Sequence, residues 1–480
     1  MVFSSTVFLF LFLPVVLLVY FALPKGMRNA WLLVASLFFY VWGEKEYSLV
    51  MIGSLVANYL FGLLVDATRD GPHARKALTL TIVANLGTLI AFKYAGLIAD
   101  TYNTAAVHLG WKLWHLAPVH LPIGISFFTF HAMSYVIDIY RGDAKVQRNP
   151  LDMGVYITLF PQLIAGPILR YHDVADQLRS RVVTWDKFGY GSRRFIIGLA
   201  KKMLLANTLA AVADHIFVLP AEHLAAPVAW LGIVCYTLQL YFDFSGYSDM
   251  AIGLGAMMGF HFLENFNYPY ISRSIQEFWR RWHISLSNWF RDYLYIPLGG
   301  NRCAGWRVGF NLVTVFFLCG LWHGASWCFV AWGLFHGLFL VLERTAWGSV
   351  LKRLPSPLRH LYALLVVMVG WVFFRVENFA NAWDYLLAMA GLNHPVGYTY
   401  TATYYLDPVT QVTLGCALVA ATPIAPYLRE KWLEAQLFPM SPAGEIALRC
   451  SRLGALLGLL TLSAMQLAEG TYNPFIYFRF

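Results

Sequence analysis

His323 is the residue of this sequence with the clearest potential for chemistry, because it stands inside an apolar stretch. It lies in the run Cys319–Ala325, where Gly320 and Gly324 allow other groups to approach closely. Ionisable residues in membrane segments are rare and usually functional. Because burial disfavours the cation, this ring is expected to stay neutral, take a proton from a hydroxyl and pass it on, as acyl transfer to an alcohol requires. The alternative is a core histidine hydrogen-bonded to a carbonyl.

Two further residues near His323 could be thought to act with it. Cys319 lies one helical turn earlier, which raises a Cys–His nucleophile pair, but a small apolar packing residue is the interpretation we favour. His336 would lie about 220° around the helix from His323 if one continuous helix joined them. We therefore expect His336 to be structural.

A second histidine, His283, lies in the most polar long block, 264–307. From Ile275 to Leu294 apolar residues recur three or four apart, and charged or amide side chains, Asn288 among them, occupy the opposite arc. This pattern predicts one amphipathic helix lying at the inner membrane interface, where its tryptophans suit the headgroup region. At about 100° per residue His283 falls on the border of the apolar arc, so it is expected to face protein more than water.

A third polar cluster, Tyr241–Asp249, contains two carboxylates and two serine hydroxyls at the end of an apolar run. Such groups cannot be left unpaired cheaply, so we favour a structural ion-pair network. Three arginines are the predicted partners: Arg273, Arg280 and Arg281. The functional alternative is that Asp243 and Ser245 line the passage of the acyl donor or acceptor.

Composition narrows the classes of protein to which these residues can belong. Of 480 residues 59% are apolar and only 13% charged, whereas soluble chains carry roughly 25% charge. No two of the 14 histidines lie three or four apart, and the six cysteines show no C-x-x-C spacing, so no metal site is expected. The net charge of +9 marks cytoplasmic loops of a membrane protein, and nucleic-acid binding is not expected.

The fold class expected from these numbers is an all-α polytopic integral membrane protein with about eleven transmembrane helices, in the range of about 10–12. The first apolar run is expected to be a retained span with the N-terminus outside, since Lys25 and Arg28 follow it directly. The candidate spans lie near residues 5–23, 29–43, 47–65, 77–99, 121–140, 196–218, 227–244, 360–375, 411–427 and 453–470.

Two apolar stretches are expected not to cross. Residues 151–169 carry Pro161 and Pro167 and have basic residues on both sides, so they are predicted to be a re-entrant segment. Residues 308–342 are also bounded by basic residues, and 35 residues give about 52 Å of helix, or about 26 Å for each arm of a hairpin. Since a hydrocarbon core is about 30 Å thick, the apex with His323 should stay inside the membrane.

The chain contains no linker that would separate domains. We predict a single domain, 1–480, in four parts. These parts are N-terminal helices 1–263, the amphipathic motif block 264–307, the short hairpin 308–342 and C-terminal helices 343–480.

Several motifs together resemble the membrane-bound O-acyltransferase family. They are the runs Glu277–Ser287, Arg291–Arg302 and Gly320–Gly324. Within the family the chain looks most like the bacterial branch that O-acetylates exopolysaccharides such as alginate. That likeness extends to Met1–Ser5, Tyr241–Gly255 and Pro474–Tyr477, and is weakest in 376–452.

The resemblance implies a ring of about eleven helices with re-entrant pieces and a thin centre around the catalytic histidine. It makes His323 the invariant catalytic histidine and His283 the second polar residue of the site. A glycine commonly stands in the family where this chain has Cys319, which weighs further against a nucleophilic cysteine. We also expect substrate contacts from five residues: Trp282, Asn288, Trp322, Asp243 and Ser245.

The function expected on this basis is O-acetylation in the bacterial inner membrane, surrounded by lipid and without a tightly bound cofactor. A cytosolic thioester, acetyl-CoA, would supply the acetyl group, and a periplasmic acetyltransferase partner would pass it to the polysaccharide. The same chemistry on cellulose, peptidoglycan, teichoic acid, a lipid or a protein is one alternative. A transporter of a polysaccharide unit or small acid is the other, although the sequence lacks the internal symmetry that would favour it.

Overall fold

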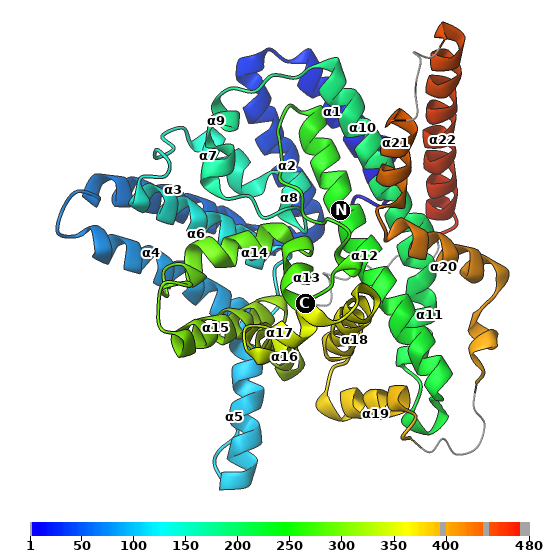
Figure 1. Cartoon of the computed structure of the whole chain (residues 1–480). Coiled ribbons are helices and arrows are strands. Elements are labelled where there is room, and N and C mark those ends of the chain that lie inside the picture. The colour runs from blue at the N-terminus through cyan, green and yellow to red at the C-terminus, as the bar shows by residue number, and fades with distance from the viewer. Residues whose placement is uncertain (1, 394–399, 435–440, 471–480) are drawn as a thin grey trace.

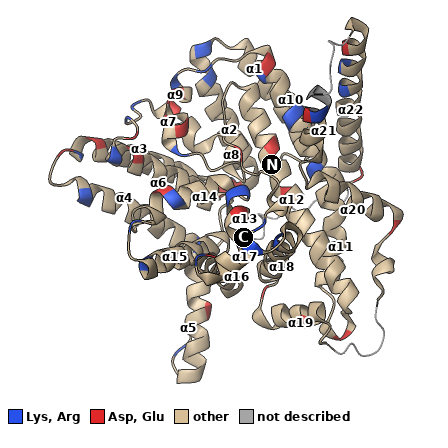
Figure 2. Cartoon of the chain, in the orientation of Figure 1, with Lys and Arg blue, Asp and Glu red and all other residues tan. Residues whose placement is uncertain are grey.

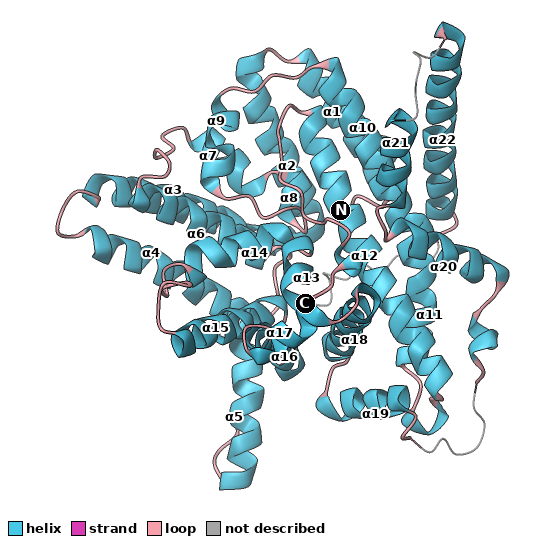
Figure 3. Cartoon of the chain, in the orientation of Figure 1, coloured by secondary structure: helices cyan, strands magenta, loops and turns pink. Residues whose placement is uncertain are grey.

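The computed structural model of the protein describes residues 2–393, 400–434 and 441–470 (Figure 1). Every regular element in these ranges is helical (Figure 3), as expected for an all-α protein. The terminal motif Pro474–Tyr477 lies outside the described residues. The first helices are α1 (Leu13–Ala22), α2 (Arg28–Glu44), α3 (Ser48–Thr68), α4 (Ala74–Leu89), α5 (Ala95–Leu109), α6 (Ile125–Arg141), α7 (Pro150–Thr158), α8 (Phe160–Leu163) and α9 (Tyr171–Arg179).

The remaining helices form the centre and the C-terminal part of the molecule. The central ones are α10 (Trp185–Ala200), α11 (Asn207–Phe217), α12 (Ala226–Met257), α13 (Ile275–Arg281), α14 (Ile284–Phe290), α15 (Gly305–His323) and α16 (Trp327–Leu342). The last ones are α17 (Ala346–Arg353), α18 (Ser356–Arg375), α19 (Phe379–Ala390), α20 (Pro408–Ala420), α21 (Ile424–Glu434) and α22 (Pro442–Ala468).

The helices have the length and composition that membrane crossing needs. Seven helical segments of the described chain are long and apolar enough to cross, or eight if α16 and α17, bent by 78°, form one span. One of these segments, Lys25–Thr68, holds both α2 and α3, which meet at Lys45 with a positive φ of 47°. Figure 2 shows Lys and Arg mainly at helix ends and connections. The chain is therefore a multi-pass membrane protein, while the count of about eleven spans stays a prediction.

Helix α12 runs through the middle of the molecule and is largely buried (Figure 1). It packs against α10 at backbone distance through two pairs of glycines. A Cβ atom on Gly198 would lie 2.5 Å from the carbonyl oxygen of Gly246, and one on Gly191 would lie 2.4 Å from that of Gly253. Small residues at facing positions are the usual way for membrane helices to approach closely.

The segment 151–169 folds back inside the protein. It begins with α7 and the single turn α8, and α7 has 9 residues, or about 14 Å of helix. That length is less than half of a hydrocarbon core of about 30 Å. Residues from Asp152 to Leu169 are buried, so other helices enclose this irregular backbone rather than lipid.

Helices α15 and α16 form the hairpin that carries His323. A Cβ on Gly320 would lie 2.3 Å from the carbonyl oxygen of Phe329, and one on Gly333 would lie 2.2 Å from that of Phe316. The two arms therefore pack backbone against backbone. Helix α15 has 19 residues, or about 28 Å, and ends at His323.

The contact between α10 and α12 yields a stability prediction. Gly198→Ala is expected to lower the free energy of unfolding by about 1–3 kcal/mol, because the helices must separate to admit the methyl group. Gly189→Ala on the same helix is the matched control, since nothing lies within 4 Å of its added Cβ. That control should be neutral or slightly stabilising. Reversible unfolding of the purified protein in detergent measures both, and equal stability of the two variants would contradict the packing argument.

Candidate active site

His323 is the last residue of α15 and lies at the apex of the hairpin. The residue is 4% exposed, and aromatic rings surround its side chain. The ring centroids of Trp332, Trp322 and Phe374 lie 4.9, 5.0 and 5.3 Å away. Neither ring nitrogen of His323 has a hydrogen-bond partner among the described residues. Buried polar groups normally have partners, so two unsatisfied nitrogens on one histidine call for an explanation, and a catalytic role is one.

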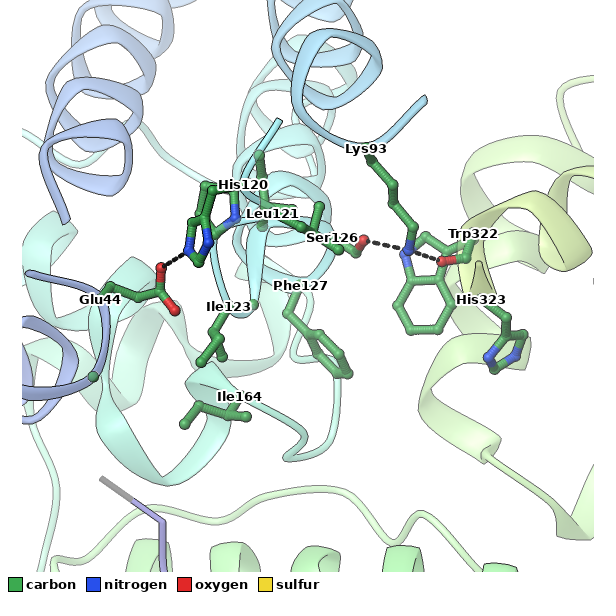
Figure 4. A pocket seen from close by; sticks show the side chains of 14 residues that line it. Glu44, Lys93, His120, Leu121, Ile123, Ser126, Phe127, Ile164, Trp322 and His323 are labelled. Atoms are coloured by element: carbon green, nitrogen blue, oxygen red, sulfur yellow. Dashed lines mark hydrogen bonds and ion pairs between the residues drawn. The ribbon is translucent and has the colours of Figure 1, made fainter. Parts of the chain in front are cut away.

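A cavity of about 360 Å³ reaches His323, and we call it the His323 cavity. Figure 4 shows Lys93 and Trp322 on the same wall as His323, with Glu44 and His120 on the far side. His120 Nε2 and a carboxylate oxygen of Glu44 lie 3.0 Å apart. The volume suits a small reacting group or one sugar unit. His323 thus borders a cavity, and the chemistry expected from the sequence requires one.

The apex is fixed by donors from a neighbouring helix. The π-helical turn Ile90–Tyr94 continues α4 and places two consecutive side chains against the end of α15. Lys93 donates to the carbonyl oxygen of Trp322, and Tyr94 donates to that of Leu321 at 2.7 Å. The last carbonyls of a helix lack partners within it and carry the negative end of its dipole. A cation and a hydroxyl therefore stabilise the α15 terminus and hold His323 in place.

The helix expected over 275–294 is not continuous, and this corrects the sequence prediction. α13 ends at Arg281, Trp282 is extended, and α14 begins at Ile284. His283 stands in the break with φ 44° and ψ 54°, in the left-handed region that only a few non-glycine residues adopt. As expected, His283 faces protein, and it is fully buried.

Asn265 holds His283 in this position. Its Oδ1 atom lies 3.2 Å from His283 Nδ1 and accepts from the backbone N–H and the hydroxyl of Ser285 at 3.2 and 2.9 Å. Its Nδ2 atom donates to Ser248 Oγ at 3.0 Å, which fixes the orientation of the amide. Since the facing atom is an acceptor, Nδ1 of His283 carries the proton and Nε2 is the basic nitrogen. Asn265 gave no signal in the sequence, because it lies outside the periodic run that contains His283.

The two candidate histidines lie side by side. Their ring centroids are 6.4 Å apart, and the His283 ring is 6.0 Å from that of Trp322. His283 lies outside the candidate membrane spans, and burial lowers its pKa to about 3, so this ring is neutral at pH 7. The structure therefore joins His323, His283 and Trp322 in one cluster.

His336 belongs to the second arm and is structural in its contacts. Its Nδ1 atom accepts a hydrogen bond from Trp279 Nε1 at 3.4 Å. Trp332 contacts both His336 and His323, with centroid distances of 5.3 and 4.9 Å. The helix is not continuous between the two histidines, because α15 ends at His323. His336 thus packs behind Trp332. The break in the helix after His323 keeps the two histidines apart, and not the angle of about 220° that one continuous helix would impose.

A second cavity, of about 230 Å³, lies farther toward the start of α15, and we call it the arginine cavity. It is bordered by Cys319 and by three arginines, Arg280, Arg291 and Arg344, and its lining contains no acidic residue. Cys319 and His323 are four residues apart, or about 6 Å along the helix axis. The two cavities are therefore bordered by residues that lie one turn of α15 apart.

The carboxylates of the third polar cluster are paired with cations from α10 and the π-helical turn that follows it. Asp243, which is 1% exposed, lies 2.7 Å from Lys202 Nζ. Asp249 lies 2.7 Å from both Arg194 and Lys201. These pairs join α12 to its neighbours inside the molecule, as the ion-pair interpretation of the sequence expected.

The arginines predicted to neutralise these carboxylates are the wrong ones. Arg273 and Arg281 pair instead with Glu277, one helical turn away from each. Arg280 lines the arginine cavity. Nearness in sequence misled the prediction, because the true partners come from helices that cross α12 and not from the segment that follows it.

The remaining candidate residues lie in different surroundings. Trp322 lines the His323 cavity, whereas Trp282 is buried outside both cavities, 5.1 Å from Trp371. Asn288 is half-buried on α14, outside both cavities. Ser245 is buried on α12, and its hydroxyl has no hydrogen-bond partner among the described residues. The structure therefore gathers only some of the expected substrate contacts around His323.

Comparisons with known proteins show which proteins this chain is similar to. Residues 125–380 match the model of the membrane-bound O-acyltransferase family. The chain is 43% identical over 526 residues to the probable alginate O-acetylase AlgI of Pseudomonas aeruginosa, with 100% of both chains covered. It is 49% identical to the protein of that name from Pseudomonas syringae pv. tomato over 79% of this chain and 73% of the relative. It is 37% identical to a peptidoglycan O-acetyltransferase of Helicobacter pylori, over 82% and 80%.

The ion pair between Asp243 and Lys202 can be tested for a purely structural role and for a role in lining the substrate passage. Asp243→Asn or Lys202→Met alone should cost about 3–5 kcal/mol of stability, because each leaves an uncompensated buried charge. The double variant should recover most of that loss. Unfolding of all three variants in detergent measures the coupling, and additive losses would contradict it. If the pair only holds helices together, the double variant also keeps its activity, whereas a residue lining the substrate passage would not.

Proposed function

The chain belongs to the membrane-bound O-acyltransferase family, and on this premise we propose that it moves an acetyl group from cytosolic acetyl-CoA to a hydroxyl group across the bacterial inner membrane. That the protein is an O-acyltransferase follows from the family and from its relatives. The donor, the acceptor and the direction of transfer are the parts that we propose.

The observation that carries the proposal is the position of His323. It combines a buried ring, two ring nitrogens without a partner among the described residues and a cavity whose lining includes the residue. As general base, the ring would take the proton of the acceptor hydroxyl while the oxygen attacks the thioester carbonyl. His283, 6.4 Å away, would position the thioester or stabilise the developing charge.

The arginine cavity supports a phosphorylated thioester as donor. The guanidinium groups of Arg280 and Arg344 can bind phosphate through paired hydrogen bonds, and that of Arg291 also pairs with Asp292. An excess of basic residues also marks the cytoplasmic side of a membrane protein. In this arrangement the donor enters from the cytosol through the arginine cavity, the acceptor enters the His323 cavity from the periplasm, and the N-terminus is periplasmic.

The proposed final acceptor is an exopolysaccharide such as alginate, reached through a periplasmic acetyltransferase partner. The names of the relatives from Pseudomonas support this acceptor, and the name of the Helicobacter relative supports peptidoglycan as the alternative. Cellulose and teichoic acid stay alternatives for the same chemistry. Family membership favours all of these over a transporter that does no chemistry.

Replacing His323 tests the proposal directly. In a strain deleted for the gene and complemented with His323→Ala or His323→Asn, O-acetylation should fall by roughly 10²–10⁴-fold, because the general base is lost. Acetate released by base from each class of surface polysaccharide measures the change and identifies the acceptor. Membrane levels of each variant must equal those of the wild type. Retained acetylation at equal protein level would remove the mechanism.

Cys319→Ala is the matched control on the same helix. Cys319 lies one turn before His323 and is 4% exposed, like His323 itself. Since its thiol is expected only to pack, acetylation should remain near the wild-type level. A loss as large as that of His323→Ala would instead point to a covalent acyl-cysteine intermediate.

If the donor binds in the arginine cavity, removing the charge of an arginine there should weaken donor binding. Replacing Arg280, Arg291 or Arg344 by glutamine should raise the KM for acetyl-CoA by roughly 10-fold each, since a charged hydrogen bond is worth about 1.5–3 kcal/mol. The effect should shrink as salt is added. Arg307→Gln is the control, because Arg307 is an exposed residue of α15 that does not line the cavity. Equal KM changes for Arg307 and the three cavity residues would argue against a donor site there.

A further inference from the structure

We propose that Lys93 is a further catalytic residue, whose ammonium group donates a hydrogen bond to the thioester carbonyl oxygen as that oxygen becomes negatively charged. This inference rests on the proposed function, because it needs acyl transfer to occur at His323. Nothing in the sequence pattern marked Lys93, which lies in an apolar run. Its location in the folded chain is what draws attention to it.

The surroundings of Lys93 are unusual for a lysine. The residue is 8% exposed, and its Nζ atom donates to Ser126 Oγ at 3.1 Å and to the carbonyl oxygen of Trp322. It also lies 5.9 Å from the centre of the Trp322 ring. Among the described residues Lys93 forms no ion pair. Burying an ammonium group without a carboxylate is costly, so its retention calls for an explanation.

The hydrogen bonds of Lys93 leave one donor for a ligand. An ammonium group has three N–H donors, and the described partners accept two of them. Lys93 lines the His323 cavity and also a neighbouring cavity of about 670 Å³, which is bordered by Gly324 and Phe374 at the hairpin apex. Figure 4 shows the Nζ atom between Ser126 and Trp322, on the side of the cavity where His323 lies.

An acid and a base therefore border the same cavity. The ring nitrogens of His323 have no partner among the described residues, and the hydrogen bonds of the Lys93 ammonium group use two of its three N–H donors. A reacting carbonyl placed between them would meet both. A preformed donor in a site that excludes water stabilises a developing oxyanion strongly, and removal of one such donor typically lowers kcat by about 10²–10³-fold.

The step balances without a further reagent. The acceptor hydroxyl gives its proton to His323 while its oxygen forms a bond to the thioester carbonyl carbon. The carbonyl oxygen takes up the electron pair and accepts the hydrogen bond from Lys93. When the carbonyl re-forms, the carbon–sulfur bond breaks and the leaving thiolate takes the proton from His323. Lys93 neither gains nor loses a proton in this step.

A purely structural role for Lys93 is the alternative, because it also caps the end of α15. Tyr94 separates the two roles. It is the next residue, and its hydroxyl caps the same helix end by donating to the carbonyl oxygen of Leu321 at 2.7 Å. Tyr94 does not line the His323 cavity or its neighbour. Tyr94→Phe therefore removes a cap of α15 without removing a donor from the cavity.

The experiment compares Lys93→Met, Lys93→Arg, Tyr94→Phe and His323→Ala in the full-length protein in lipid nanodiscs. Acetyl-CoA is the donor, an extract of the host's periplasm and envelope is the acceptor, and release of the free thiol gives the rate. Lys93→Met should lower kcat by about 10²–10³-fold with an unchanged KM for acetyl-CoA. Its unfolding temperature should match that of Tyr94→Phe. Lys93→Arg should recover part of the rate, because it keeps a charged donor.

Three results would overturn the inference. They are a wild-type kcat in Lys93→Met, an equal loss of kcat in Tyr94→Phe, and a fall in activity that merely follows a fall in the amount of folded protein. If Lys93→Met does not fold, Lys93→Arg decides: its displaced donor should lower kcat at unchanged stability, and a wild-type kcat would overturn the inference. A wild-type rate in His323→Ala would instead refute the proposed function, whatever the Lys93 variants show.

Discussion

Polar groups inside a bilayer must find their partners within the protein, and the arrangement of this molecule depends on that constraint. The end of α15 is the clearest case, because its last carbonyls lack partners within the helix and accept from Lys93 and Tyr94. Asp243 is balanced by Lys202 for the same reason. Where buried polar groups have partners, the hydrogen bonds and ion pairs hold neighbouring helices together. At His323 the ring nitrogens have no partner among the described residues, and the residue borders a cavity. Unmet polar capacity next to an open cavity is a sign of function rather than of poor packing.

Local departures from α-helical geometry place the groups that meet this constraint. The π-helical turn Ile90–Tyr94 directs Lys93 and Tyr94 to neighbouring carbonyls of α15. A second π-helical turn, Lys201–Ala206, directs its first two lysines to two carboxylates of α12. A π-turn widens the helix locally and is common at functional sites. In both cases two consecutive residues reach the same neighbouring helix, which regular α-helical spacing would not allow.

The sequence predicted the elements that depend on length and hydropathy, and missed those that depend on contacts between distant residues. His323 could be placed at an apex because the distance between basic flanks limits the reach of the hairpin arms. The break at His283 could not be predicted, because the apolar period continues across it and Asn265, which holds it, lies 18 residues away. The lysines that pair with the α12 carboxylates were missed for a similar reason: they lie in what reads as an uninterrupted apolar span.

Under the proposed function, the two cavities bordered by neighbouring turns of α15 would let one histidine serve two compartments. A transporter has to carry its substrate past the midplane and close the path behind it. Here Cys319 borders one cavity and His323 borders the other, and these two residues are one helical turn, about 6 Å, apart along α15. Under the proposed function, a thioester at the end of a long, flexible arm would insert only its acyl group that far, and its phosphates would stay with the arginines. Glycines at the contact between the two arms of the hairpin bring the backbones together. The acetyl group would then change carriers near His323, while donor and acceptor remain on opposite sides.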